Sequence, residues 1–207
     1  MAHDDTTMDS SKDPLAQYEE GCMHLKAKNY QLALDSFNKA LQLNPRYYEA
    51  SYKKAVVYQL TGYDKFAARR YSEVLRFKPE MDQARINLAT LHRKHKFYAG
   101  AEEQYRMVIH HNYQCFEAHY NLANVLVDQK KSEEAMKEYK VCLKLKPNFA
   151  QVYNNIGVLF LEKNYPEEAL SQFKRAAQLS PSNKTFVANV QTVQKIIAAK
   201  KPKSSTM

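Results

Sequence analysis

The sequence predicts an all-α solenoid, because one pattern of side chains recurs every 34 residues along the chain. An alanine occupies the same register in five successive segments, at Ala33, Ala67, Ala101, Ala135 and Ala169. An aromatic ring follows four residues later, at Phe37, Tyr71, Tyr105, Tyr139 and Phe173. A small or β-branched side chain comes three residues after the ring, at Ala40, Val74, Val108, Cys142 and Ala176. A fixed period of this length is typical of solenoids, in which each unit buries its apolar face only by stacking on the next.

These intervals also identify the kind of element that carries the pattern. Side chains at i, i+4 and i+7 lie on one face of an α-helix, and this helix is the second of each segment. A proline follows five residues after the small side chain, at Pro45, Pro79, Pro147 and Pro181, whereas the third segment has Tyr113. Proline ends a helix because it lacks a backbone donor and disfavours α geometry in the residue before it.

A first helix precedes the second one in each segment. Its own small residue again recurs every 34 residues, at Gly21, Ala55, Ala89, Ala123 and Gly157. The first helix of the chain is expected to begin at Pro14, with Asp13 as its cap. Start signals for second helices are Asp64, Ser132, and Asn164 with Pro166. No run of residues alternates with period two, so no sheet is predicted.

The two ends of the chain differ from the repeating part. Residues 1–13 are acidic and polar, and we expect them to be disordered. Residues 184–199 carry apolar side chains on one helical face, which predicts a single capping helix for the last segment. Residues 200–207 form a short basic tail, expected to be flexible and solubilising, with a weak nuclear-import signal as the alternative.

The register of these small, aromatic and proline residues closely resembles that of the tetratricopeptide repeat family. The resemblance implies a right-handed α-solenoid of five helical hairpins over residues 14–181, with the capping helix after them. The repeats would span residues 14–47, 48–81, 82–115, 116–149 and 150–183. The chain departs from the family at the fourth residue of the repeat, which is often aromatic: Gln17, Ser51, Arg85 and His119 stand there, and only Tyr153 fits. Tyr113 in place of proline is the other departure.

Composition bounds the functions that remain. No apolar run is long enough to cross a membrane, and the N-terminus is unlike a targeting peptide, which favours a cytoplasmic protein, with nuclear or ciliary sites as alternatives. Three cysteines without CxxC spacing suggest reduced thiols rather than a disulfide or metal framework. His92 and His95 lack further metal ligands. Without a phosphate loop or a nucleophile motif, we expect no enzyme, no cofactor and no metal.

The resemblance implies a ligand groove lined by the first helices. The sixth residue of the repeat is Asn87, Asn121 and Asn155, and Asn189 stands in the same register of the cap. These asparagines resemble the ladder in the repeats of O-linked N-acetylglucosamine transferases, which holds a peptide backbone. An amide can donate to and accept from an extended peptide. The alternative is that the amides bond to adjacent helices or to water. Further groove candidates are Tyr52, Lys53, Tyr120, Asn124 and Asn154. The cations of a chaperone-tail carboxylate clamp are missing.

Positive charge is concentrated in the second repeat and the start of the third. Residues 46–96 carry 12 basic and 5 acidic side chains, out of a net charge of +9 for the chain. The predicted basic patch comprises Lys54, Lys65, Arg69, Arg70, Arg85, Arg93 and Lys94. Such a patch attracts acidic proteins, phosphates or RNA, although scattered charges are usually a solvated helix surface.

Three functions therefore stay open. The leading one is a non-catalytic adaptor that binds an extended peptide in its groove. The second is a constitutive scaffold subunit of a larger assembly, of the ciliary-transport, ubiquitin-ligase or organelle-import type. The third, from a different class, is RNA association through residues 46–96.

Overall fold

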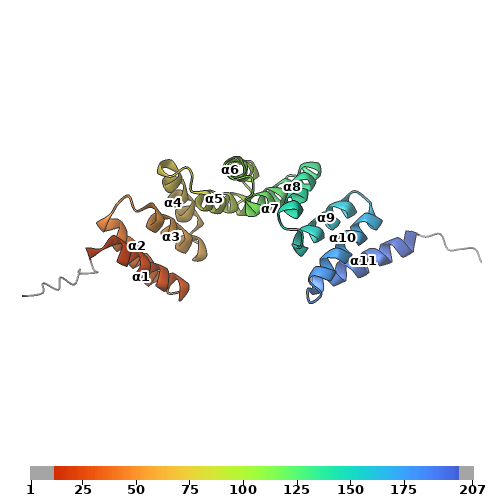
Figure 1. Ribbon diagram of the computed structural model, residues 1–207, viewed down its shortest axis with the longest axis horizontal. Coiled ribbons are helices and arrows are strands. Elements are labelled where there is room, and N and C mark those ends of the chain that lie inside the picture. The colour runs from red at the N-terminus through yellow and green to blue at the C-terminus, as the bar shows by residue number, and fades with distance from the viewer. Residues whose placement is uncertain (1–11, 201–207) are drawn as a thin grey trace, which may run out of the picture. The chain divides into compact units, whose positions relative to one another are not determined.

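The computed structural model describes residues 12–200 of the chain. All regular elements in this range are α-helices, which confirms the predicted fold class (Figure 1). The helices are α1 (Pro14–Lys26), α2 (Tyr30–Leu43), α3 (Tyr48–Leu60), α4 (Asp64–Phe77), α5 (Asp82–Lys94), α6 (Tyr98–His111), α7 (Phe116–Asp128), α8 (Ser132–Leu145), α9 (Ala150–Glu162), α10 (Pro166–Leu179) and α11 (Lys184–Lys200). The predicted disordered N-terminus and basic tail lie almost wholly outside the described residues.

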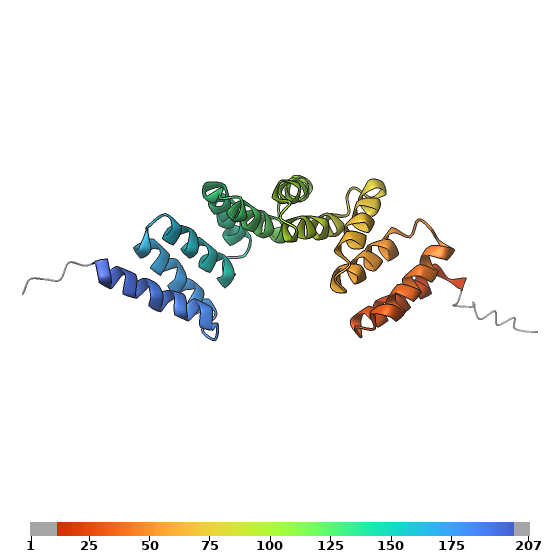
Figure 2. The same cartoon turned by 180° about the vertical axis from the view of Figure 1, so that it is seen from behind.

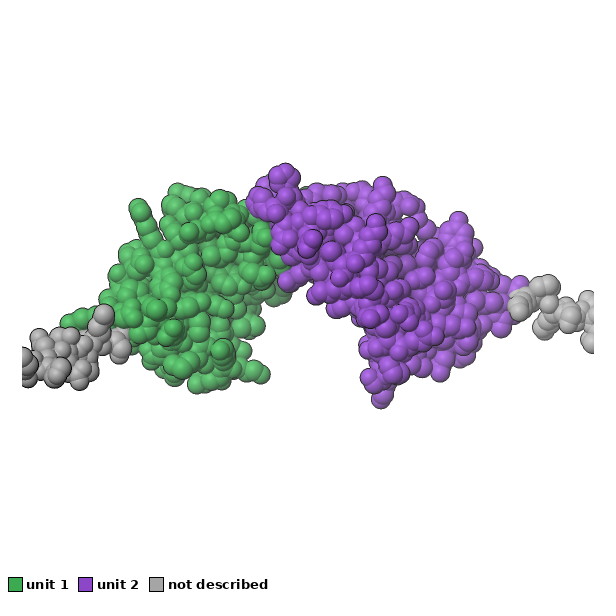
Figure 3. Space-filling view, viewed as in Figure 1, with its two compact units in different colours: residues 1–104 green, residues 105–207 purple. Residues whose placement is uncertain are grey.

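The chain divides into two compact units, residues 1–104 and 105–207, and the division falls within α6 (Figure 3). In the first unit α1 packs against α2 and α3 against α4, while α2 contacts α3 and α4 contacts α5. In the second unit α7 packs against α8 and α9 against α10, α8 contacts α9, and α11 covers α10. Consecutive helices therefore form hairpins within each unit, as both views of the ribbon show (Figures 1 and 2).

The core consists of the residues that the 34-residue pattern selects. Ala33, Ala67, Ala101, Ala135 and Ala169 are fully buried, and the five aromatic rings that follow them are at most 1% exposed. Cys142, at the small core register, is also buried, and burial raises the pKa of its thiol to about 12. These side chains stabilise the hairpins because small residues let helices approach closely while the rings fill the remaining space.

The small residue of each first helix is matched to the ring it faces. A Cβ added to Gly21 would lie 2.5 Å from the Phe37 ring, and one added to Gly157 would lie 2.7 Å from the Phe173 ring. The second, third and fourth repeats combine alanine in this register with tyrosine instead. Glycine is thus required where phenylalanine fills the interface, because an alanine methyl group would overlap the ring.

The turn inside each hairpin uses one left-handed residue. Lys28, Gly62, Lys96, Lys130 and Asn164 all have positive φ, between 61° and 82°, and they are 34 residues apart. The second helix begins two residues later, at Tyr30, Asp64, Tyr98, Ser132 and Pro166. The start signals therefore lie close to the true helix starts. Asp64 and Ser132 are nevertheless first helical residues rather than caps, since Tyr63 and Lys131 hold the cap positions, without a side-chain cap hydrogen bond. Asp13 does cap α1, accepting from the Leu15 and Ala16 amides at 3.0 and 3.3 Å.

The fourth residue of three repeats ties its helix to the preceding loop. Arg85 donates to the Pro79 carbonyl at 2.8 Å, and the Tyr153 hydroxyl donates to the Pro147 carbonyl at 2.9 Å. His119 Nε2 lies 2.9 Å from the Tyr113 carbonyl, in the same register. Arginine and histidine thus replace the aromatic residue expected here by making the same bond, each to a carbonyl six residues earlier.

Two of these three side chains also reach the second helix of their own hairpin. Arg85 Nη1 donates to Gln104 Oε1 at 2.9 Å, and His119 Nδ1 lies 2.6 Å from Glu138 Oε2. Both partners stand 19 residues after the residue that they contact. The departures from the family pattern at Arg85 and His119 therefore add a bond within the hairpin.

Candidate functional site

In the first unit, the predicted groove residue Asn87 is bound to the neighbouring hairpin. Its Nδ2 donates to the hydroxyls of Tyr52 and Tyr71, at 3.2 and 3.1 Å. The Tyr71 hydroxyl in turn donates to Gln59 Oε1 at 2.8 Å. Burial raises the pKa of Tyr71 far above its ordinary value, so the phenol stays protonated and can serve as this donor.

The second unit repeats this arrangement around Asn155. Asn155 Nδ2 donates to Asn124 Oδ1 at 3.2 Å and to the Tyr139 hydroxyl at 3.1 Å. The Tyr139 hydroxyl donates to Asn124 Oδ1 at 2.6 Å, and Gln151 donates to Asn155 Oδ1 at 2.9 Å. Both amide hydrogens of Asn155 and one lone pair of its oxygen are therefore already in use.

The last predicted rung is also held within the second unit. Asn189 of α11 donates from Nδ2 to Asn154 Oδ1 of α9 at 2.7 Å. Asn154 is 7% exposed, whereas Asn121 and Asn124 on α7 are half-buried. Among the described residues of this unit, the Asn121 side chain makes no hydrogen bond and the side-chain amide nitrogen of Asn124 has no partner.

These contacts revise one part of the sequence interpretation. The asparagines were predicted to form a ladder for a peptide backbone, yet Asn87, Asn155 and Asn189 each bond to a neighbouring helix. The alternative left open at the sequence level, bonding to adjacent helices, therefore describes these three. What remains for a ligand is the unused capacity of Asn121 and Asn124, and the second N–H and the oxygen of Asn189.

The aromatic candidates lie among other rings. Tyr52 is tilted against Tyr71 at a centroid distance of 5.9 Å, and Lys53 Nζ lies 5.7 Å from the Tyr52 centroid. Tyr120 stacks on Phe116 at 6.0 Å and meets Phe149 edge-on at 5.6 Å. Tyr52, Lys53 and Tyr120 are half-buried. Their rings can therefore contribute both to packing and to the rim of a surface.

The predicted basic patch is not one continuous cationic surface. Lys54 and Arg85 are buried, at 9% and 8% exposure. Arg69 and Arg70 both pair with Glu73, at 3.1 and 2.9 Å. Lys94 pairs with Asp64 at 2.6 Å. Lys65 is exposed on α4, and Arg93 is half-buried on α5. Ion pairing and burial thus remove much of the free charge that the sequence suggested.

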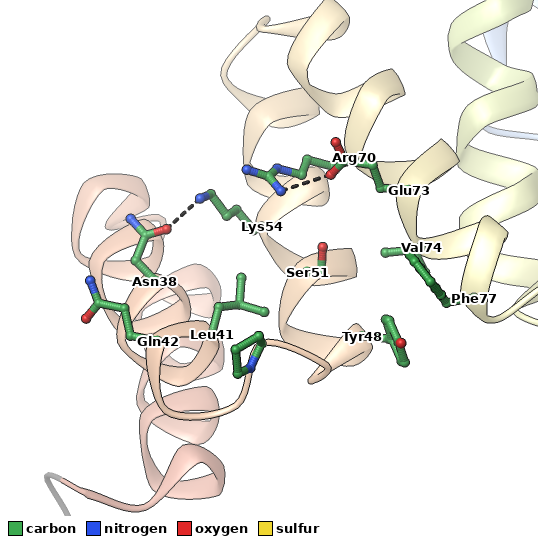
Figure 4. A pocket seen from close by; sticks show the side chains of 11 residues that line it. Asn38, Leu41, Gln42, Tyr48, Ser51, Lys54, Arg70, Glu73, Val74 and Phe77 are labelled. Carbon is green, nitrogen blue, oxygen red and sulfur yellow. Dashed lines mark hydrogen bonds and ion pairs between the residues drawn. The ribbon is translucent and has the colours of Figure 1, made fainter.

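The cavity in the first unit contains residues that the sequence interpretation assigned to no pocket. It has a volume of about 500 Å³ and is lined by α2, α3 and α4, with Ser51, Lys54 and Arg70 among its residues (Figure 4). A signal was present in the sequence: lysine stands at Lys54 where the next three repeats have Leu88, Leu122 and Ile156. In the part of the chain that the structure describes, no three His, Cys, Asp or Glu side chains form a metal-binding group.

Models of the tetratricopeptide repeat match residues 14–47 and 150–183, and a related repeat model matches residues 123–164. The first and last matches coincide with segments predicted from the 34-residue register. The chain belongs to the tetratricopeptide repeat family. Repeats of this family are generally non-catalytic modules that bind protein or peptide partners. No curated protein sequence matches the chain significantly.

Solved tetratricopeptide repeat structures share this fold. Matches include a crystal structure of MamA, with 20% identity and a TM-score of 0.73 over 80% of this chain and 96% of that one. YrrB, described as having an unusual peptide-binding site, matches at 20% identity and 0.73 over 87% and 93%. Pseudomonas aeruginosa pilF matches at 20% identity and 0.78 over 92% and 86%. At these identities the likeness concerns the fold.

Between residues 12 and 200, none of the helices is both long and apolar enough to cross a bilayer.

Proposed function

We propose that this tetratricopeptide repeat protein is an adaptor that binds an extended partner segment along the first helices of its second unit. The observation that carries the proposal is the chain of amides on α7, α9 and α11. Asn124, Asn155, Asn154 and Asn189 are held by hydrogen bonds between neighbouring helices, so their side chains are oriented before a ligand arrives. A preorganised polar surface loses less side-chain entropy on binding than a mobile one.

The two α7 asparagines are the groups with the most unused capacity. Asn124 Oδ1 accepts from Tyr139 and Asn155, which leaves its amide nitrogen to donate outward. Asn121 is available as both donor and acceptor. The two amides would form hydrogen bonds with the backbone of the partner segment rather than with its side chains. Tyr120 would supply an apolar contact beside them.

The test uses substitutions that keep the internal bonds. Asn124→Asp retains the oxygen that accepts from Tyr139 and Asn155 but removes the amide donor. Asn121→Asp likewise removes the amide donor of residue 121, whose side chain has no internal bond to lose. Peptides selected from a displayed random library on the wild-type chain serve as probes. Calorimetry with these peptides should show about tenfold weaker binding for each variant, since one or two hydrogen bonds of about 0.5–1.5 kcal/mol are lost.

Gln172→Glu on α10 is the matched control, because it makes the same amide-to-carboxylate change on a second helix. Its affinity should equal that of the wild type. Equal loss in all three variants would indicate a general effect of charge and would refute the α7 site. Alanine substitution of Asn87 or Asn155 would be a poorer test, because it removes bonds between hairpins and lowers stability as well.

A second candidate, the constitutive scaffold subunit, rests on an exposed aromatic cluster in the first unit. Tyr63 and Phe66 are each 59% exposed, and they contact one another and Tyr58 at centroid distances of 5.7–6.5 Å. Exposed apolar groups of this kind mark protein interfaces. If the chain is a permanent subunit, a tagged Tyr63→Ser, Phe66→Ser double variant should elute from native extract at a smaller size than the wild type. Identical elution would exclude this surface.

RNA association receives less support from the structure. Arg69 and Arg70 share the carboxylate of Glu73, Lys94 pairs with Asp64, and Lys54 and Arg85 are buried, so the patch offers a phosphate backbone fewer accessible cations than its sequence suggests. RNA binding whose affinity falls steeply with salt concentration, as expected of phosphate contacts, would place RNA association above the two protein-binding functions.

A further inference from the structure

The second repeat differs from its neighbours at two registers that meet in one cavity. The fourth residue of the repeat is Ser51, where the following repeats have Arg85, His119 and Tyr153. Those three long side chains tie their helix to the preceding loop carbonyl. Serine is too short to fill the same space, and Ser51 lines a cavity of about 500 Å³ between α2, α3 and α4 (Figure 4).

The second difference places a cation in this cavity. Lys54 stands three residues after Ser51, in the register that holds buried Leu88, Leu122 and Ile156 in the next repeats. Its side chain is 9% exposed, and its Nζ donates to Asn38 Oδ1 at 2.5 Å. An ammonium group has three donors, so this single bond leaves two of them unused by Asn38. Burial, and next the charge of Arg70, lower the pKa of Lys54.

A second cation approaches from α4. In the third and fourth repeats, Gln104 and Glu138 occupy the register of Arg70 and bond to Arg85 and His119. Ser51 is too short to provide such a partner, and Arg70 instead pairs with Glu73 on its own helix at 2.9 Å. Arg69 pairs with the other oxygen of Glu73 at 3.1 Å, which balances much of that carboxylate's charge. Lys54 and Arg70 therefore give the cavity a net positive charge.

We propose that this cavity binds a carboxylate side chain of an acidic peptide, with Lys54 and Arg70 as its cationic partners. Apolar groups border the cations: Leu41, Val74 and the stacked rings of Tyr48 and Phe77, whose centroids are 5.7 Å apart. They suit an aliphatic residue next to the carboxylate. A monoanion fits better than a phosphate dianion, because Glu73 also lines the cavity. A carboxylate near Lys54 would also compensate the cost of burying its charge.

This site is separate from the amide surface of the proposed function and does not depend on it. Ser51 and Lys54 line the cavity, whereas Tyr52 and Lys53 on the same helix were assigned to the first-helix groove. The proposal thus gives the chain a second recognition site, for an acidic side chain, formed by the second repeat together with α2 of the first.

Fluorescence anisotropy with a defined probe tests the site. The probe is a fluorescein-labelled peptide, Ser-Gly-Glu-Leu-Glu-Leu-Gly-Ser, and its counterpart has glutamine in place of glutamate. The wild-type chain should bind the glutamate peptide at least tenfold more tightly than the glutamine peptide at low ionic strength. Lys54→Leu, which installs the residue type of Leu88, should abolish this preference, and Arg70→Met should weaken binding about threefold to tenfold.

Two further variants separate the cavity from general electrostatics. Lys65→Met removes the same charge from the same helix, but Lys65 is exposed, does not line the cavity and does not pair with Glu73. It should bind as the wild type does. Ser51→Tyr fills the space with the residue type of Tyr153, leaves the charge unchanged and should abolish binding. Thermal melts must show that each variant is folded. Lys54→Leu and Ser51→Tyr are expected to fold because Leu88 and Tyr153 occupy the same registers in other repeats.

Three results would overturn the proposal. The first is equal binding of the two peptides, or none, by the wild type. The second is a loss in Lys65→Met as large as in Arg70→Met, which would indicate attraction to the surface of α4. The third is full binding by folded Ser51→Tyr, which would place the peptide outside the cavity.

Discussion

At the scale of single residues, side chains that break the repeat pattern carry specific contacts. His119 is 2% exposed, and both ring nitrogens face acceptors, Glu138 at 2.6 Å and the Tyr113 carbonyl at 2.9 Å. Asp64 receives Lys94 and His95 at one oxygen, at 2.6 and 2.7 Å. Such contacts contribute more to the stability of the fold where burial protects them from water. The His119 and Asp64 contacts differ in the exposure of their partners and allow this dependence to be tested.

His119→Ala should destabilise the second unit by about 1–3 kcal/mol, because it leaves a half-buried carboxylate and a loop carbonyl without their shared partner. Chemical denaturation followed by circular dichroism measures this change. His119→Tyr, which copies Tyr153, keeps the bond to the carbonyl and should recover part of the loss. Equal stabilities of the alanine variant and the wild type would show that water replaces the imidazole at no cost.

The Asp64 cluster should make stability depend on acid pH. The hydrogen bond from Lys94 lowers the pKa of Asp64, more than burial raises it, and His95 lowers it further. A lowered carboxyl pKa contributes stability above the unfolded value of 3.8, and this contribution is lost as pH falls through the folded value. Asp64→Asn should therefore cost about 1 kcal/mol at pH 7, because its partners are exposed, and nothing near pH 2.

Denaturant titrations at the two pH values provide the measurement for Asp64. Glu80→Gln is the control, since Glu80 is 69% exposed and lies 3.9 Å from Lys78. A constant difference between Asp64→Asn and the wild type across this pH range would contradict the ionic explanation.

At the scale of elements, each hairpin depends on a single left-handed residue in its turn. Only Gly62 among the five has no Cβ; the others are three lysines and one asparagine. A side chain costs roughly 1–2 kcal/mol in this conformation, so four of the turns are strained and must be held by the packing of their two helices. Glycine at residue 62 relieves that strain in the repeat that also holds the buried Lys54.

Gly62→Ala isolates this backbone term, because an added Cβ meets no atom within 4 Å. We expect a loss of about 1 kcal/mol in the free energy of unfolding, measured by denaturant titration. Lys130→Ala serves as the control, since both residues carry a Cβ at φ 63° and the stability should hardly change. If Gly62→Ala were as stable as the wild type, the turn would have to relax to a different conformation.

At the scale of the whole chain, α11 covers an apolar surface of the preceding hairpin, α9 and α10. Val193 of α11 is buried in a cluster with Ala169 and Phe173, and Phe186 is 3% exposed. In a repeat protein each unit is stabilised by its neighbours, so the loss of a terminal element is felt first by the adjacent hairpin.

Deleting residues 184–207 should destabilise α9 and α10 by about 3 kcal/mol or more, since it removes the burial of Phe186 and Val193 and exposes Phe173. Amide hydrogen exchange should show lost protection in these two helices and unchanged protection in α1–α4. A chain lacking only residues 201–207 is the control and should exchange as the full chain does. Unchanged protection in α9 and α10 would show that α11 is dispensable.

The 34-residue register by itself determined the helical class, the family, and the core alanines and rings, and local start signals marked the helices that begin at Pro14, Asp64, Ser132 and Pro166. The register could do so because each of its features depends on local spacing repeated five times. Only the tertiary structure decided which polar residues are buried and which side chains they bond to. Whether the amide of Asn87 is free and what the ammonium group of Lys54 bonds to depend on side chains 16 to 35 residues away. Periodicity places such residues on a face, but only the packed helices show which of them their neighbours already use.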